Sequence, residues 1–207
     1  MIYRWVSLLF AAILALTVTA HAQAPAQEAP DVLVKRVAED VLQTIRSDKD
    51  LQTGNQAKVK QLIESKLAPN FDFPRMTALA MGRNWRSATP EQQKSLTDEF
   101  RTLLVRTYSG ALSNYRDNAM DYAALKMNPG DTDVTVRTAV RRPGQAPVQI
   151  DYSMAKTAEG WKAYDVIVAG VSLVTNYRDE FNDAIKQSGV DGLIKMLVGK
   201  NKGPTPK

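Results

Sequence analysis

The side chains that most often carry out catalysis are scarce in this sequence. Its single histidine is His21, inside the apolar N-terminal segment, and the chain has no cysteine. Outside that segment the sequence therefore lacks the commonest zinc and copper ligands. It also lacks the histidine of a Ser–His nucleophile pair and both members of a Cys–His pair. Ser172 follows a glycine and a valine as in a nucleophile elbow, but the closing glycine is absent. We therefore predict that Ser172 caps a helix, and we expect no bound metal and no cofactor.

Two aspartates remain as possible acid–base groups. Asp165 follows Tyr164, and a buried Asp–Tyr pair in a cone-shaped pocket can serve an isomerase or dehydratase that acts on an apolar substrate. This hypothesis requires Asp151 or Asp165 to point into such a pocket. The alternation of apolar and polar residues places Asp151 opposite the apolar face, and we favour a structural hydrogen bond for Asp165. We therefore do not expect an enzyme.

The first 22 residues have the organisation of a secretory signal peptide. Arg4 supplies the positive charge, an apolar stretch follows, and residues 20–22 match a signal-peptidase site. We expect cleavage after Ala22, with Ala24 as the alternative, export to the periplasm, and no stable membrane insertion. Removal of Arg4, the only charged residue of this segment, lowers the formal charge from +5 to +4. The remaining basic residues are dispersed, so we do not expect nucleic-acid binding.

Six segments have apolar residues at the spacing of amphipathic helices. Two of them begin with clear signals. Asp72 is a predicted N-cap followed by Pro74, and Thr89 precedes Pro90 and Gln92 in the pattern of a capping box. The predicted helices cover residues 31–47, 59–67, 73–81, 90–115, 173–185 and 190–197.

Between residues 121 and 169 the apolar period changes to two, as in half-buried strands, and Pro- and Gly-containing turns separate the segments. We predict a four-stranded antiparallel meander. Helices before and after a sheet indicate one α+β domain, residues 31–199, whose helices cover one face of a curled sheet. Residues 23–30 form a predicted flexible lead and residues 200–207 a flexible tail. The predicted strands are residues 122–127, 134–141, 148–155 and 161–168.

Three groups of residues, in a fixed order along the chain, carry a resemblance to one known family. The groups are Phe71-Asp72-Phe73 with Met76, Gly82, Trp85, residues 87–90, Gln92, Phe100, Leu104 and Tyr108; residues 161–166 with 170–174, 176–178 and Phe181; and residues 189–193. Together they resemble the MlaC family of periplasmic phospholipid-transport proteins, which are also known as toluene-tolerance proteins. The departures from the family pattern are Met81, Met154 and Ala169, and Ala169 stands where an acidic residue is expected.

The resemblance implies a carrier that shuttles phospholipid between two membranes. Its partners would be an inner-membrane ABC-transporter complex with a substrate-binding ring protein, and an outer-membrane lipoprotein–porin complex. The implied role is maintenance of outer-membrane lipid asymmetry, and we expect a monomer. A periplasmic chaperone for apolar peptides, with an open groove, is a further alternative.

The resemblance also implies an apolar cavity between the sheet and the helices. An apolar sheet face opposite an apolar helical stripe is normally an ordinary packed core, so the pattern alone favours a core and only the resemblance favours a cavity. Tyr164 can lie at the rim, in the pocket or in the packing, because its facing depends on whether strand 161–168 contains a bulge. The expected lipid-binding residues are Phe100, Leu104, Tyr108, Val136, Ile150, Tyr152, Met154, Tyr164, Val166, Val168, Val171 and Val174.

Overall fold

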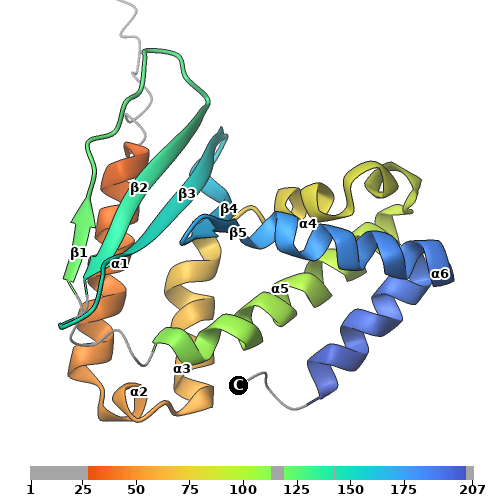
Figure 1. Cartoon of the computed structure of the whole chain (residues 1–207), viewed down its shortest axis with the longest axis horizontal. Coiled ribbons are helices and arrows are strands. Elements are labelled where there is room, and N and C mark those ends of the chain that lie inside the picture. Colours follow the sequence, from red (N-terminus) through yellow and green to blue (C-terminus); the bar gives the residue numbers. More distant parts are fainter. Residues whose placement is uncertain (1–27, 113–118, 142, 204–207) are drawn as a thin grey trace, which may run out of the picture.

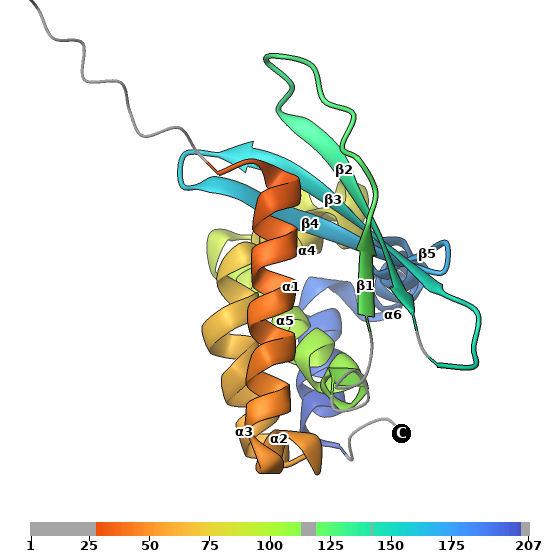
Figure 2. The same cartoon turned by 90° about the vertical axis from the view of Figure 1, so that its left-hand side faces the viewer.

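A sheet occupies one side of the molecule, and helices pack against it and beside it (Figure 1). The structure, a computed structural model of the 207-residue chain, describes residues 28–112, 119–141 and 143–203. Helix α1 packs across one face of the sheet, and α4, α5 and α6 form a helical group next to it (Figures 1 and 2). The expected signal peptide, residues 1–22, lies outside the described residues.

Polar side chains cap the helices α2 to α5, whereas the first helix, α1, follows Ala29 and has no side-chain cap. Asp48, Asn55 and Asp72 each accept hydrogen bonds from backbone N–H groups of the turn that follows. The predicted capping box is confirmed: Gln92 N donates to Thr89 Oγ1 at 3.2 Å, and Thr89 N donates to Gln92 Oε1 at 2.9 Å. These helical elements are α1 (Pro30–Ser47), α2 (Lys49–Gln52), α3 (Gln56–Leu62), the π-helical turn η1 (Ile63–Leu67), the 3-10 turn η2 (Ala68–Asn70), α4 (Phe73–Met81), the 3-10 turn η3 (Gly82–Ser87) and α5 (Pro90–Leu112).

The sheet is an antiparallel meander in the order β1-β2-β3-β4-β5, which confirms the predicted α+β class with five strands instead of four. The first strand was placed wrongly, since β1 ends where the predicted strand 122–127 begins. Beyond Tyr122 the backbone leaves β2 after one further hydrogen bond, from Ala123 N to Arg137 O. The additional strand has two residues. The strands are β1 (Ala119–Tyr122), β2 (Asp133–Arg141), β3 (Val148–Thr157), β4 (Gly160–Val168) and β5 (Val171–Ser172).

Helix α6 (Leu173–Lys202) contains the two helices predicted after the sheet and continues into the expected tail. Its first residue follows Ser172, whose hydroxyl accepts a hydrogen bond from Thr175 N at 3.0 Å, so the predicted N-cap is confirmed. A sharp kink interrupts the helix at Gly189, which has φ 68° and ψ −173°. The kink lets both halves pack against α5.

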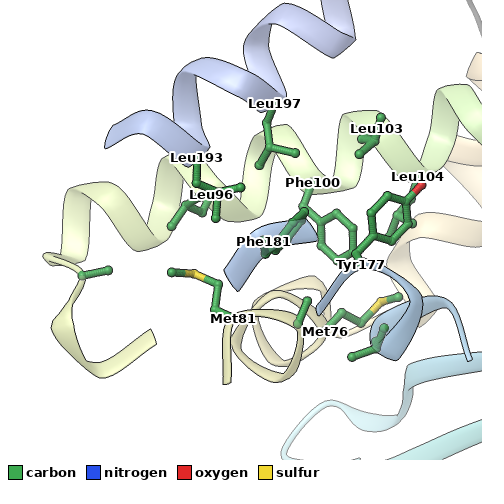
Figure 3. Close-up of a cluster of buried hydrophobic side chains, with 13 residues drawn as sticks. Met76, Met81, Leu96, Phe100, Leu103, Leu104, Tyr177, Phe181, Leu193 and Leu197 are labelled. Atoms are coloured by element: carbon green, nitrogen blue, oxygen red, sulfur yellow. The ribbon is translucent and has the colours of Figure 1, made fainter. Parts of the chain in front are cut away.

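Buried apolar side chains form three clusters. The largest joins α4, α5 and α6, and Figure 3 shows Phe100 and Phe181 at its centre, with ring centroids 5.1 Å apart. A second cluster joins the N-terminal half of α1 to the sheet and includes Trp161. A third joins the C-terminal half of α1 to α2, α3, η1 and α5 and includes Ile45. The candidate site lies where residues of all three clusters approach one another.

Candidate functional site

A cavity of about 310 Å³ lies between the sheet, helix α1, the segment from η1 to α4, and helix α5. Of the described side chains that line it, none carries a charge, and the ones with a polar group are Asn70, Tyr108 and Tyr152. The lining residues are Leu33, Val34, Val37, Ala38, Val41, Leu42, Ile45, Ile63, Leu67, Ala68, Asn70, Phe71, Phe73, Met76, Leu104, Val105, Tyr108, Met120, Val140, Ile150, Tyr152, Met154, Ala163, Val166, Val168 and Leu173.

Strands β3 and β4 supply five of the twelve residues that the sequence analysis selected. Ile150, Tyr152 and Met154 are alternate residues of β3, so their side chains share the face of the sheet that the helices cover. Val166 and Val168 occupy the same face of β4, where Val166 pairs with Tyr152 and Val168 with Ile150. The period-two pattern therefore located this wall of the cavity.

Tyr164 is the extra residue of a β-bulge in β4, because its neighbours Ala163 and Asp165 pair with consecutive residues of β3. The bulge changes the alternation, so Ala163 and Val166 both line the cavity although they are three residues apart. Tyr164 itself is not part of the wall. The guanidinium carbon of Arg75 lies 3.6 Å from its ring centroid, in a cation–π contact.

Helix α5 supplies Leu104 and Tyr108, which lie one turn apart and both line the cavity. Burial raises the pKa of the Tyr108 phenol, and the neighbouring Tyr177, which hydrogen-bonds to it, raises that pKa further. The phenol is therefore neutral at neutral pH, and its hydroxyl adds a hydrogen-bonding group to an uncharged wall.

Four other selected residues also lie outside the wall, each for its own reason. Phe100 and Val174 are buried in the cluster between α4, α5 and α6, where the rings of Tyr177 and Phe181 fill the space around Phe100. Val136 packs against α1 in the second cluster. Val171 lies on β5 beyond the turn that ends β4, and 56% of its surface is exposed.

Helix α1 is the largest part of the wall that the sequence analysis did not assign. Its apolar stripe was recognised as one face of an amphipathic helix, but it was not placed at the site. The width of the stripe is the signal that was available: Leu33 and Leu42 extend it beyond the row formed by Val34, Val37 and Val41. The α1 residues in the wall are Leu33, Val34, Val37, Ala38, Val41, Leu42 and Ile45.

The two aspartates of the enzyme hypothesis are not among the lining residues. Asp165 accepts hydrogen bonds from Ser172 Oγ at 2.6 Å and from Val174 N at 3.1 Å, so it ties β4 to the start of α6. This is the predicted structural hydrogen bond. Asp151 lies 3.9 Å from Arg137 Nε, its cross-strand neighbour. Within the described ranges, no three His, Cys, Asp or Glu side chains gather as they would around a metal ion.

The fold and the cavity define a class, an α+β binding protein whose cavity suits an apolar ligand. In the described part of the chain, no helix has the length and apolar character needed to cross a membrane. The chain belongs to the MlaC family, since the family described as MlaC protein matches residues 35–198.

Similar proteins are known from several bacteria. The chain is 24% identical over 204 residues to the intermembrane phospholipid transport system binding protein MlaC of Haemophilus influenzae, covering 94% of this chain and 91% of that protein. It is 25% identical over 175 residues to the toluene tolerance protein ttg2D of Pseudomonas putida, covering 84% and 80% of the two chains. A phospholipid-binding protein of Ralstonia solanacearum, solved in complex with a phospholipid, is 44% identical with a TM-score of 0.79. That match covers 84% of this chain and 97% of the Ralstonia chain.

Proposed function

We propose that this chain is a periplasmic phospholipid carrier. The observation that carries the proposal is the cavity of about 310 Å³, whose described wall has no charged side chain. Each methylene that moves from water into apolar surroundings contributes ~0.8 kcal/mol, so about a dozen methylenes contribute on the order of 10 kcal/mol. Acyl chains are therefore the ligand that this wall favours, and the bound phospholipid of the Ralstonia relative supports the same choice.

The volume of the cavity limits how much of a lipid molecule it can hold. An apolar cavity of about 150 Å³ holds a benzene molecule, so about 310 Å³ corresponds to roughly a dozen ligand carbon atoms. Two acyl chains of about fifteen methylenes each would need more room by the same measure. We therefore expect the walls to move apart when a whole diacyl lipid is bound.

The partners that we propose follow from family membership. The carrier would exchange lipid with an inner-membrane ABC-transporter complex that includes a substrate-binding ring protein, and with an outer-membrane lipoprotein–porin complex. Its role would be to maintain outer-membrane lipid asymmetry. We propose that it acts as a monomer. The name of the Haemophilus relative, a binding protein of an intermembrane transport system, supports this assignment.

We favour transport over catalysis because the described residues of the wall include no acid–base pair. Asp151 and Asp165 lie outside it, and Tyr164 contacts Arg75 instead of the cavity. A chaperone for apolar peptides would need a groove open along the chain, whereas this cavity is walled by the sheet and by several helices.

The test is to purify the mature protein, extract it with organic solvent and identify lipids by mass spectrometry. We expect about one phospholipid per protein. Val168→Arg and Ile150→Glu each place a charge in the apolar wall, and we expect both variants to fold and to lose nearly all bound lipid. Lipid occupancy equal to that of the unmodified protein in both variants would contradict the proposal.

The matched control is Val171→Arg. Val171 is the cross-strand partner of Val168 in the β4–β5 hairpin, yet it is exposed and does not line the cavity. The same new charge a few ångströms away should therefore leave the lipid content unchanged. Circular dichroism of the three variants and the unmodified protein would establish that all four are folded.

A further inference from the structure

Arg101 lies beside the cavity, on the same face of helix α5 as two lining residues. Leu104 and Val105 line the cavity and follow Arg101 by three and four residues, the spacings that share one helix face. The guanidinium carbon is 5.3 Å from the ring centroid of Phe73, another lining residue. The Arg101 side chain is 38% exposed, so it reaches solvent next to this edge of the cavity wall.

The hydrogen bonds of this guanidinium are incomplete. Its Nη2 donates to Glu64 Oε2, and the two residues form an ion pair. Its Nε is buried and has no hydrogen-bond acceptor among the described residues. A buried donor of a charged group is costly to leave unpaired, so this atom marks a place for an additional acceptor.

The partner of Arg101 belongs to an unusual element. Glu64 lies in the π-helical turn η1, between the lining residues Ile63 and Leu67. Such turns are rare and occur frequently at functional sites. The nearby Lys66 of the same turn is already bound to both carboxylate oxygens of Asp40 on α1, at 2.7 Å. Arg101 is therefore the better candidate for binding a ligand that arrives at this edge.

We propose that Arg101 binds the phosphate of a phospholipid whose acyl chains occupy the cavity, and that Glu64 pairs with the guanidinium when no lipid is bound. The planar set of donors on arginine matches phosphate oxygens, and the free Nε supplies one of them. The inference rests on the proposed carrier function and adds a polar end to the apolar site.

The experiment compares two lipids that differ in the phosphate alone. Delipidated protein is titrated with dioctanoyl phosphatidic acid and with dioctanoylglycerol, and binding is followed by calorimetry. We expect Arg101→Gln to weaken binding of the phosphatidic acid by about tenfold or more and to leave the affinity for dioctanoylglycerol unchanged. In Arg101→Gln the carboxylate of Glu64 loses its partner, and its charge could itself repel a phosphate. The double variant Glu64→Gln/Arg101→Gln removes this charge as well and should behave in the same way.

Arg106→Gln is the matched control, because Arg106 lies on the same helix but donates to the backbone oxygen of Gly203. Its preference for the phosphatidic acid should equal that of the unmodified protein. An equal loss for both lipids in Arg101→Gln and in the double variant, or no loss for either, would overturn the phosphate site. Failure of the unmodified protein to bind either lipid would instead count against the carrier function itself.

Discussion

Ala169 and Gly170 form the two-residue turn that joins β4 to β5, and both have positive φ, 50° and 83°. This is the pattern of a type I′ turn, in which asparagine or aspartate followed by glycine is preferred. Among the described residues, Ala169 is the only non-glycine residue with positive φ. Alanine has no polar side-chain group that could stabilise this conformation by a local hydrogen bond. An acidic residue, which the sequence analysis expected at this position, would suit this type of turn.

Ala169→Asn should therefore stabilise the protein. We expect a gain of about 0.5–1 kcal/mol in the free energy of unfolding, because asparagine tolerates the left-handed region better than alanine. Urea denaturation followed by circular dichroism measures the change. Ala169→Val should instead destabilise the protein, since a β-branched residue disfavours positive φ. Equal stability of all three proteins would show that the turn is not strained.

Helix α6 depends on two glycines for its shape. Gly189 has a backbone conformation that is essentially restricted to glycine, and it produces the kink between the two halves of the helix. At Gly192 a Cβ atom would lie 2.1 Å from Ser188 Cβ, so a side chain there would force the kinked segment apart. Beyond the kink, Leu193 and Leu197 lie in the cluster around Phe100 (Figure 3).

Gly189→Ala should consequently reduce the free energy of unfolding by about 1–3 kcal/mol, the usual cost of a strained backbone conformation. Thermal or urea denaturation measures the loss. Gly199→Ala is the matched control, because Gly199 is an exposed residue of the same helix and a Cβ there would meet no atom within 4 Å. We expect this control to be neutral or slightly stabilising. A Gly189→Ala protein as stable as the control would contradict the assigned role of the kink.

The molecule as a whole is organised around space that its own side chains leave unfilled. The helical cluster between α4, α5 and α6 is a complete core, and it supports one side of the cavity through Leu104 and Met76. The opposite side is helix α1, whose apolar face covers the sheet. Such an arrangement leaves apolar side chains with fewer packing partners than in a filled core, and a bound ligand supplies the missing contacts.

Removal of bound lipid should therefore lower the thermal stability of the protein. A ligand at about 100 times its dissociation constant stabilises by about 2.7 kcal/mol, which corresponds to roughly 5–10 °C for a chain of this length. Scanning calorimetry before and after delipidation measures the shift, and added phospholipid should restore it. The Val168→Arg protein should melt at one temperature with or without lipid. A delipidated protein as stable as the loaded one would indicate that the cavity does not hold the lipid.

The features determined by the sequence itself are the local ones. Residues that are neighbours in the chain determine three kinds of feature. They are the starts of helices at Asp72, Thr89 and Ser172, the alternation along β3, and the α+β order of the elements. Family membership also followed from motifs in their order. Backbone irregularities are harder to predict from the sequence, because the bulge at Tyr164 depends on how β4 pairs with β3.

The tertiary structure alone decided which apolar residues face empty space. Phe100 and Leu104 lie one turn apart on the same helix, yet Phe100 is packed among aromatic rings and Leu104 lines the cavity. The apolar stripe of α1 likewise has the composition of an ordinary core face. Packed and cavity-lining side chains have the same chemistry, and they differ in the distance to the layer opposite, which is a property of the assembled fold.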